Sequence, residues 1–542
     1  MYVPTALVRM APWLLGCGIW FALLMPSALA TAPPRFLIFH VDGVAAVDFD
    51  RALAEGRLPN IEQAFAGGAR ADASSLFFAV TPVIYPRMHS GESNAGPGWL
   101  GFGGYDREAG RPISEAAVFF DYVQVFPRRS LASMLYGAPL LDALAGLAMQ
   151  NLPDLLERYR VVEFFWFSTD TVGHLLGAEA QARSLERFDA YLGRLLPRLD
   201  MEGLNLVLYA DHGLSFMRGM VDLEPALLER VGAERLHYVY PNLFLHDPSL
   251  APLLARELSR PGGPDFAFYR VDAKRVHGYV DGAFVRFEAE ADGIRYLSDD
   301  DPLGYAEIGY DGSALTPDEW LALTIDAPFP ATPPNVFGYV QNPDAGDVVM
   351  GLNPPRMPVT VRAPAGAHAG LSHTDLVVPV LSRGPGLEAL AARSELWLHE
   401  LYRDIPDLAF GYEPPRERHE VEAWMRFDDL VPCLRARLSP AYRLRLGAEA
   451  SPVSWSLWSE HDVMASYLTR WWLGAGVNYQ RGEVQPMVRA EVEIDVGDAR
   501  LRIEGRYQPC GWTFGLGATF RVSEAMRVSW SAPGGVGIGF DW

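Results

Sequence analysis

LNLVLYADHG, residues 204–213, begins as an unbroken apolar run and ends in two adjacent side chains that can bind a metal, Asp211 and His212. A parallel strand that is buried on both faces has this apolar character, and polar groups at its carboxyl end lie where open α/β sheets hold ligands. The segment therefore predicts a buried parallel strand that leads into a ligand site. Taken alone, the pair is equally typical of a loop Asp that caps the next helix beside a solvated His.

The composition is that of a globular protein and excludes one class of partner. The chain has 542 residues, of which 49% are hydrophobic and 21% are charged, enough for more than one domain. Its formal net charge of -21 argues against nucleic acid, because Lys and Arg clusters hold phosphate backbones. An anionic substrate would need local positive charge, which metal ions supply most directly.

The first 30 residues have the pattern of a secretory signal peptide. Arg9 precedes an apolar run over residues 11–25, and the small residues at 28–30 suit cleavage after Ala30. The alternative is a lipoprotein cleavage box, for which LLGC at 14–17 would supply Cys17. No later run reaches 18 uninterrupted apolar residues, so no transmembrane helix is expected.

Residues 31–410 are expected to form an α/β domain with a doubly wound, mostly parallel sheet. Apolar β-like runs alternate there with helical stretches. The clearest strands are residues 36–41, 161–167, 204–210, 347–352 and 376–382, and helices are expected from residue 59, over 130–156, from 180 and over 387–405. Residues 218–345 carry Gly, Pro and Asp clusters without strong alternation, so we expect an inserted cap there.

A polar linker at 411–430 leads to an all-β region, residues 431–542, in which apolar and polar residues alternate. Such alternation predicts strands with one apolar face. A soluble sandwich would turn that face inward, whereas an outer-membrane barrel would turn it toward lipid. We favour the barrel or a barrel-like sheet, because the terminal Trp542 falls on the apolar face of the last strand and several aromatic residues suit a girdle: Trp455, Trp458, Tyr467, Trp471, Trp472 and Tyr479.

After export, Cys433 and Cys510 would be the mature cysteines, which excludes a disulfide-scaffold fold. Cys433 falls on the charged face of its strand and Cys510 on the aromatic face of its own. The sequence leaves open whether the two are bonded.

Other predicted strands are also flanked by metal-capable side chains. Asp42 follows the first strand, Asp170 follows the strand from residue 161 with His174 one helical turn later, and His368 and His373 precede the last strand. One Asp after a strand is usually a turn residue, and one surface His is usually only solvated. Their joint placement at equivalent strand ends instead predicts a site for two divalent metal ions, most suitably zinc.

These motifs resemble those of the alkaline phosphatase superfamily, and most closely its type I phosphodiesterase and nucleotide pyrophosphatase branch. The likeness spans about residues 35–390 and rests on VDG at 41–43, DTVGH at 170–174, DHG at 211–213 and AHAGL at 367–371. The resemblance implies one metal at Asp42, Asp211 and His212 and a second at Asp170, His174 and His368. His373 is the rival of His368.

The resemblance also implies a Thr or Ser nucleophile about forty residues after the first Asp. Thr81 matches best, because it stands ten residues before Gly91, as the family's Thr does before the Gly of a Thr-Gly pair. It would bind a metal ion, attack phosphorus and form a phospho-threonine intermediate. Ser74 and Ser75 are the alternatives.

Two departures from the family pattern concern the phosphate-binding region. The phosphodiesterase branch often has an Asn about twenty residues after the nucleophile, where this chain has Phe102. Asn94 is a nearby substitute. No Cys-x-Pro-x-Arg motif occurs, which disfavours a formylglycine sulfatase.

The sequence therefore predicts an exported two-metal phosphodiesterase or phosphatase in the periplasm or outer membrane of a Gram-negative bacterium. Its substrate would be a small phosphate ester, or a lipid or glycan phosphate if the C-terminal region inserts in the membrane. Two alternatives remain: a transferase that moves a phospho group to an envelope lipid or glycan, and an envelope protein with a retired site.

Overall fold

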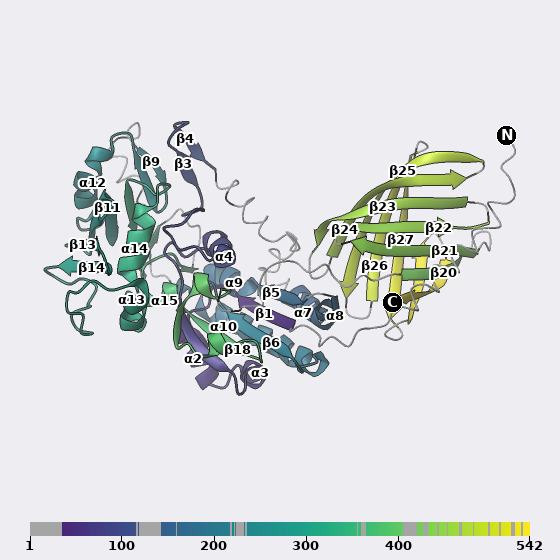
Figure 1. Ribbon diagram of the computed structural model, residues 1–542, viewed down its shortest axis with the longest axis horizontal. Helices are drawn as coiled ribbons and strands as arrows, with labels where there is room; N and C mark the ends of the chain where they lie inside the picture. The colour runs from purple at the N-terminus through teal and green to yellow at the C-terminus, as the bar shows by residue number, and fades with distance from the viewer. Residues whose placement is uncertain are drawn as a thin grey trace. The chain divides into compact units, whose positions relative to one another are not determined.

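The computed structural model describes residues 35–541, except most of 115–141, residue 159, parts of 217–235 and 355–364, most of 404–419, and short connections between the C-terminal strands (Figure 1). The expected signal peptide with Cys17, the first part of the helix expected from residue 130, Tyr467, Cys510 and Trp542 lie outside the described residues. Among the described residues, no helix is long and apolar enough to cross a membrane.

A six-stranded sheet forms the centre of the α/β region, in the order β19-β2-β18-β6-β1-β5. β18 is antiparallel to both of its neighbours, and the other strands all run in one direction. The predicted mostly parallel sheet is thus confirmed. Its strands are β1 (Arg35–Val41), β2 (Ala69–Ser74), β5 (Val161–Trp166), β6 (Leu204–Tyr209), β18 (Val377–Arg383) and β19 (Glu395–Trp397).

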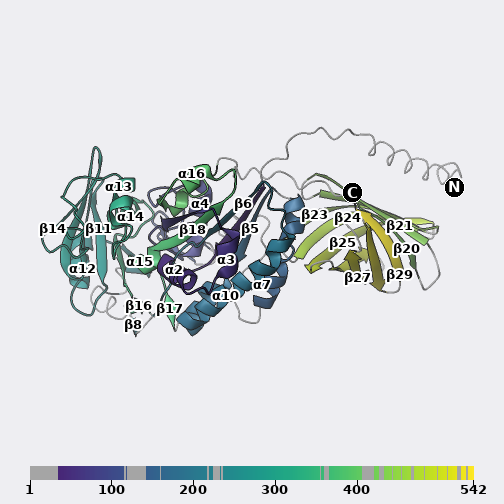
Figure 2. The ribbon, with the colours of Figure 1, turned by 90° about the horizontal axis from the view of Figure 1, so that it is seen from below.

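Helices cover both faces of this sheet (Figure 2). On β1, Phe39 meets Phe188 of α10 (Ala178–Leu195), with ring centroids 5.6 Å apart, while His40 faces Tyr85 of α4 (Thr81–Ser90) at 5.8 Å. Successive strand residues point to opposite faces, so α10 and α4 lie on opposite sides. α10 buries Leu185, Phe188, Leu192 and Leu195, as their helical spacing predicted.

The remaining helices and short strands of the α/β region connect these layers. They are α2 (Ala46–Ala54), α3 (Pro59–Ala64), α7 (Asp142–Met149), α8 (Leu152–Arg158), α9 (Ser168–Leu176), α15 (His373–Leu376) and α16 (Glu388–Ala391), with β3 (Gly104–Asp106), β4 (Arg111–Ile113), β7 (Ser215–Phe216), β8 (Gly219–Val221), β16 (Arg356–Pro358) and β17 (Gly366–Ala367).

The prediction of one helix over residues 387–405 is wrong. The segment forms α16, then strand β19, and then a short 3-10 helix at Leu398–Glu400. β19 pairs in parallel with β2, so Leu396 and Trp397 become buried at the edge of the sheet. Pairing with this edge outweighs the local helix preference of the sequence.

A second, antiparallel sheet has seven strands in the order β14-β13-β12-β11-β15-β10-β9. The strand expected at 347–352 forms as β15, but it belongs to this sheet and not to the parallel one. The elements are β9 (Leu236–Val239), β10 (Asn242–Leu245), β11 (Phe266–Asp272), β12 (Arg275–Val280), β13 (Ala283–Glu290), β14 (Gly293–Ser298) and β15 (Val348–Gly351), with α12 (Ala251–Leu258), α13 (Pro317–Thr324) and α14 (Thr332–Gln341).

The second sheet shares a core with the segment that leads to α4. Phe77 packs against Phe266 of β11 and Tyr339 of α14, with ring centroids 5.6 and 5.0 Å apart, and Phe78 packs against Tyr240. These aromatic contacts fix the chain that precedes Thr81.

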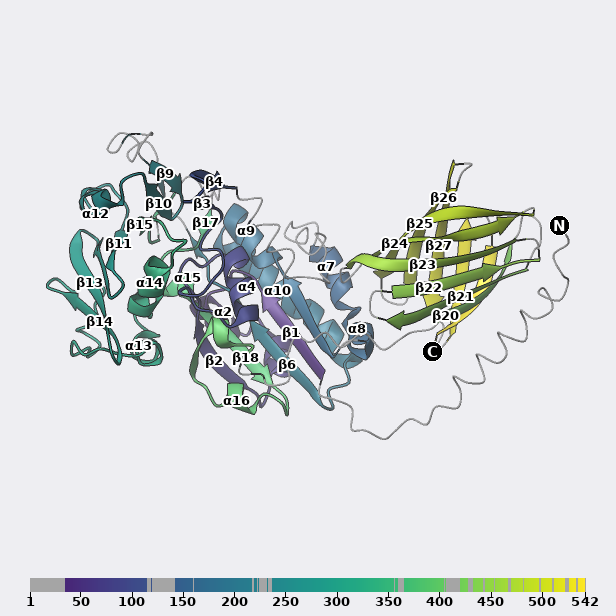
Figure 3. The same cartoon turned by 45° about the horizontal axis from the view of Figure 1, so that its top comes forward.

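The C-terminal region is a closed barrel of strands β20 to β29 (Figure 3). β20 pairs with both β21 and β29, so no strand edge is left open. It begins at Glu420, within the segment expected as a linker. The strands are β20 (Glu420–Arg426), β21 (Pro432–Ala441), β22 (Leu444–Ala450), β23 (Ser454–Ala465), β24 (Thr469–Gln480), β25 (Glu483–Val496), β26 (Ala499–Gln508), β27 (Gly511–Arg521), β28 (Met526–Ala532) and β29 (Gly535–Asp541).

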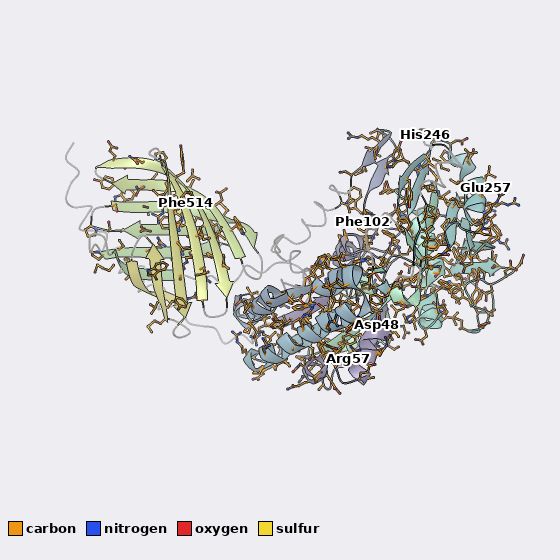
Figure 4. The ribbon with its side chains drawn as sticks, turned by 180° about the vertical axis from the view of Figure 1, so that it is seen from behind. Asp48, Arg57, Phe102, His246, Glu257 and Phe514 are labelled. Carbon is orange, nitrogen blue, oxygen red and sulfur yellow. The ribbon has the colours of Figure 1, made fainter. Side chains whose placement is uncertain are left out.

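The barrel turns its apolar face outward and its charged face inward, which rules out the sandwich alternative. Phe514 is the most exposed of its large apolar residues, at 71% (Figure 4). The others on the outside include Leu438, Leu446, Trp455, Leu457, Trp471, Leu473, Val484, Val488, Leu501, Ile503, Leu516, Phe520, Val528 and Trp530. The buried residues include Arg437, Arg445, Glu460, Arg489, Glu491, Glu493, Arg500 and Arg527.

Two aromatic residues expected in a girdle lie inside the barrel instead. The rings of Trp458 and Trp472 pack on the guanidinium groups of Arg489 and Arg445, at 4.3 and 4.0 Å from ring centroid to Cζ. Both Trp side chains are buried. Stacking on buried Arg side chains explains the inward position, which spacing alone did not reveal.

Candidate active site

Seven side chains predicted from the sequence converge at the carboxyl edge of the parallel strands. Asp42 follows β1, Asp211 and His212 follow β6, and His368 follows the short strand β17. Asp170 and His174 lie one turn apart on α9, which begins directly after β5, and Thr81 begins α4. Residues more than three hundred positions apart in the chain therefore meet at one place.

Thr81 lies in a first group with Asp42, Asp211 and His212. Its hydroxyl Oγ1 is 3.2 Å from His212 Nε2 and 3.5 Å from Asp42 Oδ1. His212 Nε2 is also 3.5 Å from Asp42 Oδ1 and from Asp211 Oδ2. All four side chains are buried.

Asp170, His174 and His368 form a second group beside the first. Asp170 Oδ1 is 3.1 Å from His174 Nε2 and 3.7 Å from His368 Nε2. The rings of His368 and His212 stack with centroids 3.7 Å apart, which joins the two groups. Ligand atoms of Asp170, His212 and His368 all lie within 4.8 Å of one another.

The spacing of these atoms fits metal coordination. Ligand atoms about 2.0 Å from a tetrahedral zinc ion lie about 3.3 Å apart, close to the separations of 3.1 to 3.7 Å in the two groups. Three buried carboxylate oxygens of these two groups accept no hydrogen bond: Asp42 Oδ2, Asp170 Oδ1 and Asp211 Oδ2. Such orphaned carboxylate oxygens are unfavourable unless a cation contacts them. The Asp and His clusters can therefore hold metal.

Backbone carbonyls orient the three His rings. His174 Nδ1 donates to Gly366 O and His368 Nδ1 donates to Ala79 O, both at 2.6 Å, and His212 Nδ1 lies 3.0 Å from Gly213 O. A carbonyl can only accept, so the proton is on Nδ1 and the lone pair of Nε2 faces the centre of the site. That is the form of imidazole that binds a metal ion.

The carboxylates and imidazoles strongly perturb one another. Burial, reinforced by the negative charges of Asp211 and Asp170, raises the pKa of Asp42 well above its usual value. Burial also acts to raise the pKa of Asp170, but the neighbouring His174 and His368 bring it down to about 2. Burial, helped by His212, holds the pKa of His368 well below its usual value. The site keeps carboxylates close together while one imidazole stays neutral, as cation binding requires.

Two glycines of the motifs are required by close approach. Gly43 has φ +68°, and a Cβ there would lie 2.8 Å from Asp170 Oδ1. A Cβ on Gly213 would lie 1.8 Å from the carbonyl oxygen of Thr374. The VDG and DHG motifs thus place each candidate ligand beside a position that has no room for a Cβ, and at Gly43 the backbone conformation also favours Gly.

The rival residues have other partners. The charged neighbours of His373, which begins α15, are Asp72 and Asp326, whereas His368 Nε2 lies 3.7 Å from Asp170 Oδ1 in the cluster. Ser75 Oγ donates to the backbone carbonyl of Asp211 at 2.7 Å, and Ser74 Oγ donates to Ser75 O. Both Ser hydroxyls support the backbone of the site.

The region of the family's phosphate-binding Asn is also occupied differently. Asn94 is buried, and its side-chain amide donates to the carbonyl of Phe77. Phe102 packs edge-on against Phe78, with centroids 5.9 Å apart (Figure 4). Asn94 therefore supports the segment that contains Phe77, and its role as a substitute for the family's Asn stays a prediction.

His40 is a member of the cluster that the sequence analysis missed. Its Nε2 lies 3.1 Å from Asp211 Oδ1, and its Nδ1 lies 4.0 Å from Glu163 Oε1. Glu163 in turn accepts hydrogen bonds from Tyr85, Tyr209 and Tyr402, at 2.6, 2.6 and 3.0 Å. One signal was available: His40 stands two residues before Asp42 and so points to the same face of β1.

The chain is similar to a known protein family over part of its length. A family model described as type I phosphodiesterase / nucleotide pyrophosphatase matches residues 128–292, a range that includes Asp170, His174, Asp211 and His212. No curated protein matches the chain.

Solved structures with similar folds include two hydrolases. Phosphonoacetate hydrolase from Sinorhizobium meliloti, in complex with phosphonoformate, is 16% identical, with 69% of this chain and 96% of that chain covered and a TM-score of 0.39. An inactive murine ectonucleotide pyrophosphatase / phosphodiesterase 5 in complex with AMP is 11% identical, with 69% and 95% covered and a TM-score of 0.42. The resemblance predicted from the sequence is confirmed by the family match: residues 128–292 of this chain match the model of the type I phosphodiesterase / nucleotide pyrophosphatase family.

Proposed function

We propose that the protein is an exported hydrolase of phosphate esters that uses two divalent metal ions, most suitably zinc, and Thr81 as its nucleophile. The observation that carries the proposal is the position of Thr81 Oγ1, 3.2 Å from His212 Nε2 and 3.5 Å from Asp42 Oδ1. Asp42, Asp211 and His212 would hold one ion next to Thr81, and Asp170, His174 and His368 would hold the other.

Bound metal ions would supply positive charge that lowers the pKa of the Thr81 hydroxyl and stabilises the phosphoryl oxygens. Thr81 Oγ1 would then attack phosphorus, the P–O bond to the leaving alcohol would break, and a phospho-threonine would form. Attack by water on the same phosphorus would restore the hydroxyl and release phosphate from a monoester substrate, or a phosphomonoester from a diester substrate. The position of Thr81 in the first turn of α4 also favours an anionic group, because the N-terminus of a helix is positively polarised.

Turnover of a chromogenic phosphodiester and phosphomonoester by the purified chain tests this function. We expect hydrolysis that a chelator abolishes and zinc restores. Thr81→Ala should lower kcat by about 10³-fold or more, whereas Thr81→Ser should keep part of it. Ser74→Ala, which removes a rival hydroxyl but not that of Thr81, should keep most of the turnover that Thr81→Ala loses. Metal-independent hydrolysis, or full activity in Thr81→Ala, would overturn the proposal.

Acid quenching during turnover separates a phospho-enzyme from direct attack by water. The expected result is a phosphate on Thr81 in the peptide that also contains Ser74 and Ser75. Adding a glycan or lipid alcohol as acceptor distinguishes hydrolysis from transfer, because a transferase would produce a new phosphoester in place of free phosphate. A retired site would bind no metal and show neither product.

We further propose that the protein lies in the outer membrane of a Gram-negative bacterium, with lipid or glycan phosphates among its substrates. The N-terminal 30 residues support export. The outward apolar face of the barrel supports contact with lipid, since β23, β24, β25 and β27 have 11 to 14 residues each, enough to cross the apolar part of that membrane. Flotation with lipid vesicles and heat-modified gel mobility test the insertion. A chain that stays soluble without detergent would contradict it.

A further inference from the structure

The interior of the barrel is crossed by ion pairs between strands that are not neighbours. Arg437 of β21 contacts Glu491 of β25 at 2.8 Å, and Arg506 of β26 contacts Glu449 of β22 at 3.0 Å. In each pair the two strands stand four places apart around the wall. Hydrogen-bonded strands lie about 4.8 Å apart, so these side chains reach across the lumen and not along the wall.

One pair joins opposite sides of the barrel. Arg435 of β21 lies 3.7 Å from Glu504 of β26, five places away in a wall of strands β20 to β29. Barrels of about eight strands have an interior that side chains just fill, whereas porins with 16 or more strands keep an aqueous channel. The number of strands and the ion pairs across the interior therefore both indicate that side chains fill the barrel.

Glu460 and Glu491 organise the centre of this interior. Glu460 forms ion pairs with Arg445 and Arg489, each at 2.7 Å. Glu491 forms ion pairs with Arg445, at 2.9 Å, and with Arg437 and Arg489. These five side chains form a continuous layer, which we call the central ion layer. Glu460 and Arg489 have 0% of their surface exposed, so the layer excludes solvent.

Two indole rings complete the layer. Trp458 and Trp472 pack on Arg489 and Arg445, and Trp472 Nε1 donates to Glu493 at 3.1 Å. Gly447, opposite Trp458 on the neighbouring strand, makes room for the ring, because a Cβ there would lie 2.1 Å from Trp458 Cε2. The layer is thus packed with apolar as well as charged groups.

Charged groups that line a water-filled pore remain solvated, whereas here they are buried and paired. Burial removes the hydration of each ion and is tolerated only when several partners replace it, as Glu491 and Arg445 have. From this we infer that the C-terminal barrel is a closed membrane anchor: lipid hydrocarbon covers its outer face, and the central ion layer blocks passage of ions and small phosphate esters through its lumen. The inference rests on the membrane insertion proposed above.

Reconstitution of the full chain in lipid vesicles tests the inference. Flotation and heat-modified gel mobility first show whether the barrel inserts. Vesicles loaded with inorganic phosphate should then retain it as well as protein-free vesicles do, and planar bilayers should show no conductance steps. Phosphate loss through the inserted wild-type barrel would overturn the closed lumen.

A charge-matched variant tests the central ion layer. Arg445→Ser with Glu491→Ser removes one positive and one negative side chain of large volume, and should cause conductance and loss of trapped phosphate. Trp458→Ala with Trp472→Ala removes volume without deleting a charge and should act in the same direction. The matched control, Arg70→Ser with Asp50→Ser, deletes an exposed ion pair of the α/β region and should leave the vesicles tight.

The outcomes separate this inference from the proposals on which it depends. If both lumen variants insert and still retain phosphate, the central ion layer is not the barrier and the inference is overturned. If the wild-type chain does not insert, flotation shows that the membrane proposal itself has failed. Hydrolysis of the chromogenic esters is measured separately in detergent, so its loss would concern only the active site.

Discussion

His40 Nε2 lies 3.1 Å from Asp211 Oδ1, and both side chains are completely buried. His40 is in turn close to Glu163, which three tyrosine hydroxyls hold in place. The contact therefore links a rigid hydrogen-bonded cluster to a carboxylate of the active site. Groups that orient a metal ligand in this way raise metal affinity without binding the ion themselves.

His40→Gln should lower zinc affinity by about 10- to 100-fold, because Asp211 would lose its fixed orientation. Competition with a zinc chelator measures the change independently of turnover. His277→Gln, a substitution on β12 of the second sheet, is the matched control and should not alter affinity. Equal affinity in both variants would show that His40 has no positioning role.

Asp170→Asn should remove one of two bound metal ions and leave the other. Asp170 contacts His174 and His368, whereas the Thr81 hydroxyl lies beside Asp42 and His212, so the group around Asp42 would keep its ligands. Metal analysis after gel filtration should give about one equivalent in the variant and about two in the wild-type chain. Loss of both ions would mean that the two groups bind metal as a single unit.

Arg87→Met should loosen the loop that follows α4. The guanidinium of Arg87 is buried and donates to the backbone carbonyls of Ser93, Gly96, Gly98 and Trp99. Leaving these carbonyls without their charged donor should destabilise the loop by about 3 kcal/mol. Hydrogen exchange of peptides over residues 92–99 measures this change. Arg70→Met breaks only exposed ion pairs and should change stability by less than about 1 kcal/mol.

Asp375 should make the α/β region less stable as the pH rises. Burial raises its pKa from 3.8 to about 6, even though it accepts hydrogen bonds from Ser215 and Gly370. The folded state therefore binds the proton more tightly than the unfolded state, and the resulting stabilisation is lost as the pH rises through about 6. Asp375→Asn cannot ionise, so the variant should gain about 2 to 3 kcal/mol relative to wild type between about pH 4 and pH 8.

Hydrogen exchange of peptides from β6 and β18, followed in the full chain at both pH values, reports this difference. Because the intrinsic exchange rate changes equally for both proteins, only the ratio of wild type to variant is needed. A ratio that does not depend on pH would contradict the raised pKa of Asp375.

Ile503→Lys should destabilise the inserted barrel by about 2 to 4 kcal/mol if its outer face contacts the middle of the bilayer. Ile503 is 46% exposed on β26. Phe284→Lys on the second sheet, where Phe284 is 40% exposed, is the matched control and should change stability by less than about 0.5 kcal/mol. Urea titration of barrels folded in lipid vesicles measures the first effect, and a value near zero would argue against lipid contact.

The spacing of apolar residues and the ends of apolar runs predicted much of the α/β region, because both patterns follow directly from burial. The continuous apolar run at residues 204–210 is required by a strand covered on both faces, and β6 is such a strand. The heptad-like spacing of Leu185, Phe188, Leu192 and Leu195 required one buried helix face. The helix predicted over residues 387–405 was wrong, because the pairing of β19 with β2 is a long-range contact that local spacing does not encode.

The faces of the barrel and the position of His40 also depend on long-range contacts that the local sequence pattern does not encode. Period-two alternation is identical for a sandwich and a barrel. The pairing of β20 with β29 shows that the sheet is closed, and the burial of its charged side chains shows which face lies inside. His40 lies in an apolar run, and its polar role depends on Glu163 and Tyr402, which come from distant parts of the chain. The convergence of polar side chains at strand ends could be predicted from the sequence, whereas the groups that support them could not.

The hydrogen bond from His368 Nδ1 to the carbonyl of Ala79 has a consequence for how this enzyme can change. Ala79 is only two residues from Thr81, so the backbone that carries the hydroxyl we propose as nucleophile also orients the ring of His368, a residue from a distant part of the chain. A substitution that displaces this short segment would move both the Thr81 hydroxyl and the His368 ring. We therefore expect substitutions that adjust activity to be tolerated more readily in the second sheet than in residues 77–81.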